Sequence, residues 1–318
     1  MPHGWAARKD ARCPVYPLRM QHRTPSARAA AAALLVALLA VPAAHAARVL
    51  VAQGADTPRL EKTLAALRER SPLPVDVLPL SANGGAALGA AWARSDRGSV
   101  LVALGPRASD EVVKLGLAGP VVHCLAGLDA MRAGVPAIPS EVPMDQQAAW
   151  LARLVPGAKT VGVLFDPAQN TRRAEAHAAA LGSAGYRTML RAVPTPAALP
   201  AALDGLAGRA DVLLALPDAT VYTRESSRGL LLYSFRRRIP IAGPSDSWVR
   251  MGSLYALDWD YAEVGAACAA MAAREANPAT APAPAAPRPR VFVNAKSAAH
   301  FGIAWDPELL RQAEMPRE

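Results

Sequence analysis

Residues 160–171, TVGVLFDPAQNT, form the stretch that most constrains the fold of this chain. Almost every residue before the aspartate is apolar, which predicts a strand buried on both faces, as in a parallel sheet. The strand ends at Asp166 and Pro167, because proline cannot donate to a β-ladder. Asn170 or Thr171 then offers an N-cap for a helix that begins just after them. Since open α/β sheets bind ligands beyond the carboxyl ends of their strands, we expect this loop at the lip of a cleft.

The same pattern occurs twice more further along the chain. Residues 211–218, DVLLALPD, end in Pro-Asp, and residues 239–246, IPIAGPSD, end in Pro-Ser-Asp. Three neighbouring strands that stop in polar loops would form one side of a ligand-binding cleft.

Strand and helix patterns alternate before this stretch as well as after it. Earlier strand patterns lie at 48–53, 75–79, 99–104 and 120–125. Such alternation with short loops predicts a parallel doubly wound sheet, and its restart at residue 160 predicts a second sheet of similar size. Two later strands, at 254–258 and 290–294, indicate that the chain crosses back between the lobes. We therefore expect an α/β fold of two doubly wound parallel-sheet lobes with a multi-strand hinge.

This interpretation divides the chain into five parts. The parts are a leader and signal peptide at 1–46; an N-terminal lobe at 47–155, with 261–277 packing back on it; a C-terminal lobe at 156–258; residues 290–318, crossing back to that lobe; and a Pro/Ala-rich loop at 278–289. The loop is expected to be exposed and extended, because proline-rich segments favour the polyproline II conformation.

Residues 27–46 have the pattern of a secretory signal peptide. A basic start and a short apolar run lead to Ala44-His45-Ala46, so we expect cleavage after Ala46 and export to the periplasm. An uncut membrane anchor is the alternative, and translation begins at either Met1 or Met20. The formal net charge is +9, and residues 1–46 hold six Lys/Arg and one Asp, so the remainder carries 9 − (6 − 1) = +4. This modest charge does not favour a nucleic-acid partner.

Neither the cysteines nor any motif in the sequence indicates a catalytic site. Cys124 and Cys268 follow the predicted cleavage site in apolar surroundings, which favours two buried thiols over the disulfide that an exported protein would permit. The sequence contains no G-x-S-x-G, P-loop or G-x-G-x-x-G motif and no metal-ligand spacing of its histidines, so we expect no cofactor, no metal and no enzyme activity. Asp258 and Asp260 lie two residues apart, on one side of the predicted strand, where paired carboxylates could act as acid and base. No nucleophile accompanies them.

Polar residues at the predicted strand ends and helix starts are the candidate ligand-binding residues. They are Gln53, Ser109, Asp166, Asn170, Thr171, Asp218, Thr220, Tyr222, Ser245, Trp248 and Asp258. Helix starts favour anionic groups, so Ser109 could bind a carboxylate, and Asp218 would suit an ammonium group or a ring N–H. Trp248 could stack on a flat ligand or pack at the lobe edge. Simple capping is the alternative role of the residues at helix starts.

Five short motifs follow one another over residues 155–315. They are Phe165-Asp166-Pro167 with Asn170; Ala210-Asp211-Val212-Leu213 with Pro217-Asp218; Ile239-Pro240-Ile241 with Val249 and Gly252-Ser253-Leu254; Asp260-Tyr261 with Gly265; and Asn294-Ala295-Lys296 with Ala298, Gly302-Ile303, Pro307, Leu309-Leu310 and Ala313. In these motifs the chain resembles the ABC transporter substrate-binding protein family that includes tryptophan- and tyrosine-type binding proteins.

The resemblance implies a type I periplasmic-binding-protein fold and a function without chemistry. It implies a monomeric protein that captures a small organic solute, amino-acid or aromatic-like, between its lobes and delivers it to an inner-membrane ABC permease. It also implies a ligand-contacting polar residue near Asp218. The alternative is a sensor of the same fold that docks on a membrane receptor or sensor kinase.

Overall fold

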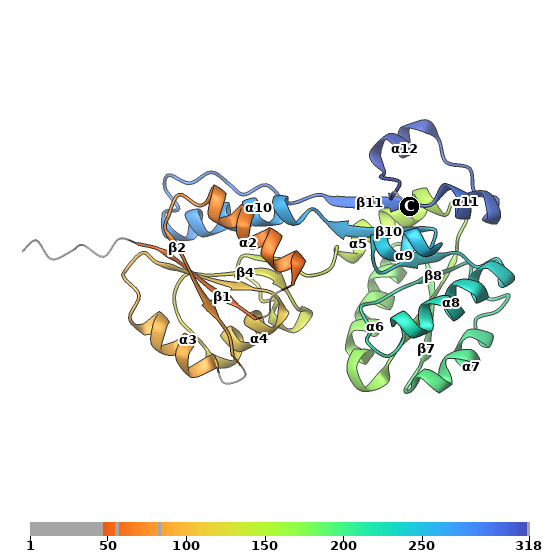
Figure 1. Ribbon diagram of the computed structural model, residues 1–318, viewed down its shortest axis with the longest axis horizontal. Helices are drawn as coiled ribbons and strands as arrows, with labels where there is room; N and C mark the ends of the chain where they lie inside the picture. The colour runs from red at the N-terminus through yellow and green to blue at the C-terminus, as the bar shows by residue number, and fades with distance from the viewer. Residues whose placement is uncertain (1–46, 55–56, 82–83, 317–318) are drawn as a thin grey trace, which may run out of the picture. The chain divides into compact units, whose positions relative to one another are not determined.

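The computed structural model of the protein describes residues 47–54, 57–81 and 84–316 (Figure 1). The predicted leader and signal peptide, residues 1–46, lie outside these residues. Each helix within the described ranges is too short or too polar to cross a membrane.

The first sheet consists of five parallel strands in the order β2-β1-β3-β4-β5 (Figure 1). Its strands are β1 (Val49–Gln53), β2 (Val75–Pro79), β3 (Val100–Leu104), β4 (Val121–Ala126) and β5 (Ala137–Pro139). Helices α2 (Pro58–Arg70) and α10 (Tyr261–Ala276) cover one face, and α3 (Gly84–Ala93) and α4 (Pro106–Leu115) cover the other. Every residue of β1, β3 and β4 is buried, as continuous apolar runs predict for strands covered on both faces.

The second sheet consists of six strands in the order β11-β10-β9-β8-β6-β7, parallel except for β11. Its strands are β6 (Thr160–Phe165), β7 (Arg187–Ala192), β8 (Val212–Leu214), β9 (Ile241–Gly243), β10 (Tyr255–Trp259) and β11 (Pro289–Val293). The helices α5 (Met144–Leu154), α6 (Pro167–Ser183), α11 (Ala295–Phe301) and α12 (Pro307–Gln312) contribute to one apolar cluster, and α7 (Leu199–Asp204), α8 (Arg224–Arg237) and α9 (Asp246–Met251) to the other clusters. Two short 3₁₀ helices, η1 (Leu128–Ala130) and η2 (Pro196–Ala198), complete the elements. The predicted fold class of two mostly parallel α/β lobes is confirmed.

The chain passes between the two sheets at three places. It leaves the first sheet after β5 and enters α5, whose Leu151 and Leu154 belong to the core of the second sheet. It returns from β10 into α10 and comes back into β11, where Trp259 and Pro289 are paired antiparallel. Residues 277–288, which connect α10 to β11, contain no helix or strand. In this segment the N–H of Arg288 donates a hydrogen bond to the Oε2 atom of Glu263 on α10 at 3.1 Å. These crossings form a hinge that contains more than one strand.

Helix α10 is held tightly against the first sheet. At Gly265 an added Cβ would lie 2.3 Å from the carbonyl oxygen of Thr63 on α2, so only glycine allows this helix–helix approach. One turn further on, Cys268 forms a disulfide with Cys124 of β4, with Cα atoms 6.2 Å apart. The expectation of two buried thiols is therefore wrong. The two cysteines are 144 residues apart in sequence, and only the return of α10 brings them together.

Helix α6 begins earlier than the sequence pattern predicted. Its N-cap is Asp166, whose Oδ1 accepts a hydrogen bond from the N–H of Ala168 at 2.9 Å, and Pro167 is its first residue. The expected N-cap at Asn170 or Thr171 is therefore wrong, because an aspartate followed by proline already satisfies the requirements of a helix start. Thr171 is inside the helix and its hydroxyl donates to the carbonyl of Pro167.

Candidate functional site

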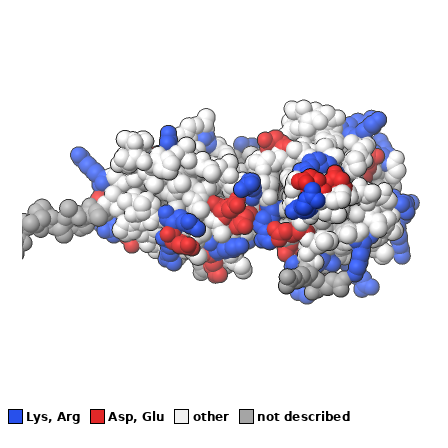
Figure 2. All heavy atoms as spheres, turned by 90° about the horizontal axis from the view of Figure 1, so that it is seen from above, with Lys and Arg blue, Asp and Glu red and all other residues white. Residues whose placement is uncertain are grey.

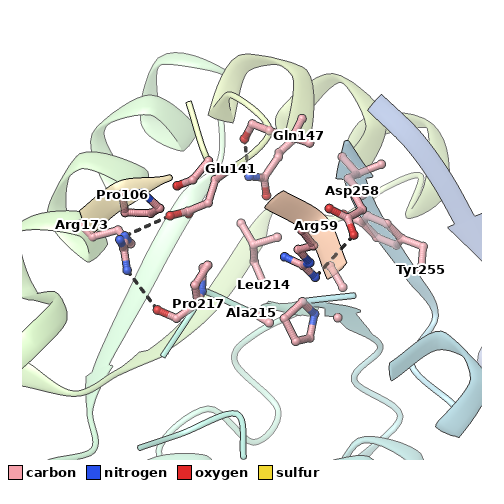
Figure 3. A pocket seen from close by; sticks show the side chains of 16 residues that line it. Arg59, Pro106, Glu141, Gln147, Arg173, Leu214, Ala215, Pro217, Tyr255 and Asp258 are labelled. Atoms are coloured by element: carbon pink, nitrogen blue, oxygen red, sulfur yellow. Dashed lines mark hydrogen bonds and ion pairs between the residues drawn. The ribbon is translucent and has the colours of Figure 1, made fainter. Parts of the chain in front are cut away.

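A cavity of about 280 Å³ lies where residues of both sheets meet, beyond the carboxyl ends of β8 and β9 (Figure 3). The N-terminal sheet and its connections contribute Arg59, Pro106, Ser140, Glu141 and Val142. The other lining residues are Gln147, Arg173, Leu214, Ala215, Pro217, Ala242, Gly243, Pro244, Tyr255, Leu257 and Asp258. This is the position at which open α/β sheets bind ligands, and the volume is just below the ~300–1,000 Å³ of pockets for drug-sized molecules.

One charged pair in the cavity joins α2 to the hinge strand β10. The Nη2 atom of Arg59 lies 3.5 Å from the Oδ2 atom of Asp258, and the Arg59 guanidinium lies 5.6 Å from the ring centre of Tyr261. The Tyr261 hydroxyl donates a hydrogen bond to the Oδ1 atom of Asp258. Burial and the neighbouring Asp258 raise the pKa of Tyr261, so this hydroxyl keeps its proton and its donor role.

The second charged cluster joins the β5–α5 connection to α6. The Oε1 atom of Glu141 lies 3.2 Å from Nε of Arg173, and its Oε2 atom lies 3.7 Å from Nε2 of His177. The Nη1 atom of Arg173 also donates to the carbonyl of Pro217 at 3.0 Å and to Oδ1 of Asn170 at 2.7 Å. Glu141 and Arg173 line the cavity, as Figure 3 shows. His177, on α6, is not among the lining residues.

Burial dominates the protonation of this cluster. It raises the pKa of Glu141, and the nearby Arg173 partly opposes that shift. Burial and Arg173 together lower the pKa of His177 to about 4. Glu141 therefore has Arg173 as its charged partner, while His177 stays neutral at physiological pH.

Asp218 is the centre of a buried network behind the cavity wall. Its Oδ2 atom accepts hydrogen bonds from the N–H of Asp166 at 2.7 Å and from Nδ2 of Asn170 at 2.8 Å. Its Oδ1 atom accepts from the N–H groups of Thr220 and Val221, both at 2.9 Å. The Thr220 hydroxyl donates to Oδ2 of Asp166 at 2.7 Å, and this bond contributes most to a lowered pKa of Asp166. The network joins the loops after β6 and β8.

Of the ligand-binding residues proposed from the sequence, Asp258 lines the cavity. The structure also brings Asp166, Asn170, Asp218 and Thr220 together, but in the network just described, next to lining residues rather than among them. The remaining ones lie elsewhere: Gln53 is buried at the end of β1, Ser109 is buried in α4, Thr171 bonds within α6, Ser245 lies 2.7 Å from the hydroxyl of Ser247, and Tyr222 packs edge-on against Trp248.

Sequence reasoning missed Arg59, Glu141, Gln147, Arg173 and Tyr255 as cavity residues. Arg59 is in the first turn of the helix after a strand, and Glu141 is in an extended polar segment between the sheets. Charged residues in such places resemble ordinary solvated surface. Examining the first turn of the helix after every strand, as well as the strand ends, would have found Arg59. Arg173 lies in the second turn of α6, where no local signal marks it.

The cavity combines opposite charges with apolar surface. Two guanidinium groups and two carboxylates line the cavity with apolar and neutral polar side chains. Among residues 47–54, 57–81 and 84–316, no group of His, Cys, Asp and Glu side chains has the arrangement of a metal site. In Figure 2, basic and acidic side chains are intermingled on the face shown, so that face offers no continuous basic surface to a nucleic acid.

Two mostly parallel α/β lobes, hinge strands between them and a polar cavity where they meet define the class of periplasmic-binding-protein-like solute-binding proteins. The model of the family described as ABC transporter substrate binding protein matches residues 94–316. The chain belongs to this family. Its members are binding proteins, and the family is typically extracytoplasmic. No curated protein matches the sequence significantly.

Several solved structures have a similar fold. A substrate binding protein with adhesive properties from Clostridium difficile, in a ligand-free, open structure, has a TM-score of 0.65 and 16% identity, covering 86% of this chain and 99% of that one. A conserved domain protein from Vibrio cholerae has a TM-score of 0.57 and 21% identity, covering 85% and 99%. An ABC domain in complex with L-Trp from Streptococcus pneumoniae has a TM-score of 0.55 and 18% identity, covering 85% and 99%. At these identities the likeness concerns the fold.

Proposed function

We propose that the protein captures a small zwitterionic solute of the amino-acid type in the cavity between its lobes and delivers it to an ABC permease. The observation that carries the proposal is the pairing of opposite charges in one small cavity. Arg59 and Arg173 can bind a carboxylate, and Asp258 can bind an ammonium group. Delivery to a permease rests on the family to which the chain belongs.

The side chain of the proposed solute is aliphatic rather than aromatic. Among the described residues that line the cavity, Tyr255 is the aromatic one, and it is only 1% exposed. Trp248, which the sequence suggested for stacking, packs against Tyr222 instead. The apolar lining includes Val142, Leu214 and Leu257 together with prolines and alanines, which suits a branched aliphatic group.

Three matched probes test this proposal. L-Leucine carries both charges, 4-methylpentanoate lacks the ammonium group, and isoamylamine lacks the carboxylate. Calorimetric titration of the purified protein should give the highest affinity for L-leucine. Comparable affinity for 4-methylpentanoate would show that the ammonium group is not recognised, and no binding of any probe would overturn the proposed solute class.

Variants of the cavity residues test which group binds which charge. Arg59→Gln should lower the affinity for L-leucine and for 4-methylpentanoate about tenfold or more, and Asp258→Asn should do so for L-leucine and isoamylamine. Glu308→Gln is the matched control, because Glu308 is exposed and paired with Arg311 on α12. Unchanged affinities in both cavity variants would overturn the assignment of the charges.

Export to the periplasm is part of the same proposal. It is supported by the family and by the signal-like pattern of residues 27–46. Fractionation of expressing cells, with N-terminal sequencing of the exported chain, should give a protein that begins at Ala47. A full-length N-terminus in the membrane fraction would favour the uncut anchor.

A further inference from the structure

Glu141 is shared between a cation that faces the cavity and a histidine that does not. Arg173 lines the cavity and lies 3.2 Å from one carboxylate oxygen of Glu141. His177, one turn further along α6, lies 3.7 Å from the other oxygen. The His177 side chain is 14% exposed, and its Nδ1 atom has no hydrogen-bond partner among the described residues. The carboxylate thus has two positive or potentially positive partners, of which only Arg173 can reach a ligand.

The groups around His177 leave Glu141 as its acidic partner. Arg173 is the charged neighbour on α6 itself, and the next charged residue of that helix, Glu175, is exposed. On α5, which packs on α6, Asp145 is exposed and Arg153 stacks over Trp150 and bonds to Gln312. On the neighbouring β7, Arg187 bonds to Thr160, and Arg191 bonds to the carbonyls of Leu190 and Gly205.

We propose that an anionic ligand group bound by Arg173 withdraws this arginine from Glu141, and that His177 then takes up one proton from solvent to become the new partner of Glu141. The cluster would therefore couple solute binding to proton uptake. This inference rests on the proposed function for its ligand, but not for its internal chemistry.

The energetics of a buried carboxylate drive the exchange. A mostly buried Glu141 that loses its counter-ion is strongly disfavoured, so a replacement cation or a proton must follow. His177 lies within contact distance of Glu141. Arg173, which disfavours the charged form of His177, is the group that moves away. Protonation makes the imidazole of His177 positively charged. Its contact with Glu141 then becomes charge-assisted and replaces the contact with Arg173.

The sign of the pH effect follows from the direction of proton transfer. Since binding takes up a proton, affinity rises as pH falls, over the range in which the complex holds the proton and the free protein does not. Neither the carboxylate nor the ammonium group of an amino-acid ligand titrates in that range, so the dependence reports the protein.

A titration without ligand tests the internal exchange. Arg173→Gln mimics the withdrawal of the arginine, so the imidazole of His177, followed by NMR, should titrate about one pH unit or more above its position in the unaltered protein. Arg172→Gln is the matched control, because Arg172 is the adjacent arginine of α6 but pairs with the exposed Asp129. An unshifted His177 in a folded Arg173→Gln protein, or an equal shift in Arg172→Gln, would overturn the inference.

Calorimetry with L-leucine in buffers of different ionisation enthalpy tests the coupling. At about pH 5 the slope of the observed enthalpy should give net proton uptake, and Glu141→Gln should bring the uptake close to zero. Binding without proton uptake would overturn this inference and leave the proposed function standing. If L-leucine failed to bind, the proposed solute class would fail, and the titration of Arg173→Gln would still decide the internal exchange.

Discussion

The Oδ2 atom of Asp218 lies 2.7 Å from the backbone nitrogen of Asp166 and accepts its hydrogen bond. This contact connects the ends of two strands whose similar Pro/Asp endings first indicated a cleft. Asp218 is only 7% exposed and accepts further hydrogen bonds from Asn170, Thr220 and Val221. The carboxylate therefore holds the loop that carries Pro217 against the first turn of α6, the helix on which Arg173 lies.

Asp218→Asn should destabilise the protein by roughly 2–3 kcal/mol. The amide has the same size, but it replaces a charged acceptor of four hydrogen bonds and points an N–H₂ group at donors. Urea unfolding followed by circular dichroism measures the difference. Asp204→Asn, at an exposed position on α7, is the control and should stay within about 0.5 kcal/mol. Equal stability of Asp218→Asn and the unaltered protein would contradict a structural role for the network.

Gly265→Ala should destabilise the packing of α10 on α2. The added Cβ would meet the Thr63 carbonyl oxygen at 2.3 Å and the Cβ of Ala66 at 2.7 Å, so the two helices must separate. We expect the free energy of unfolding to fall by about 1–3 kcal/mol. Gly229→Ala is the matched control, because Gly229 is also helical but has nothing within 4 Å of its added Cβ; that change should stabilise by about 0.5–1 kcal/mol. A neutral Gly265→Ala in thermal unfolding would show that the helices are not in close contact.

The parts of the fold that sequence predicted well are those with strong local patterns. β1, β3 and β6 are continuous apolar runs, and a buried parallel sheet leaves few alternatives for such runs. β5 was missed because it is only three residues long at a sheet edge, and α12 because a six-residue helix has too little periodicity.

The cavity was harder to predict than the sheets. Asp258 was found because it ends a strand, but Arg59 and Glu141 meet the cavity only because segments distant in sequence converge there. The polar residues at the ends of β6 and β8 were correctly predicted to be neighbours. They form hydrogen bonds with one another, however, and do not line the cavity. Local sequence does not show whether a carboxylate will find backbone N–H groups, as Asp218 does, or an open cavity.

The Cys124–Cys268 disulfide should contribute substantially to stability. It closes a segment of 144 residues and ties α10 to β4, and loops of this size give about 2–5 kcal/mol in measured examples. The double variant Cys124→Ala/Cys268→Ala should lose about that amount in urea unfolding. Thiol titration of the denatured, unreduced protein should find neither cysteine free. Two reactive thiols on unfolding without reductant would contradict the bond.

Stability should fall as the pH is lowered from about 7 to about 4. Burial lowers the pKa of His123 and lowers that of His177 to about 4, whereas both would titrate near 6.5 in the unfolded chain. Between these values the unfolded chain binds protons that the folded protein does not, so each histidine can remove up to about 1.4 kcal/mol per pH unit. The raised pKa of Glu141 acts in the opposite direction, because its folded form takes up a proton first as pH falls.

Urea unfolding at a series of pH values in this range measures the slope. His177→Gln should make the decline shallower, since one of the two buried imidazoles is removed. Ala176→Gln is the control, because Ala176 is exposed on α6 beside His177 and the change removes no titrating group. Its slope should match that of the unaltered protein even if its absolute stability differs. If His177→Gln kept the full slope, His177 would not be held neutral by burial, and the exchange proposed between His177 and Arg173 would lose its starting state.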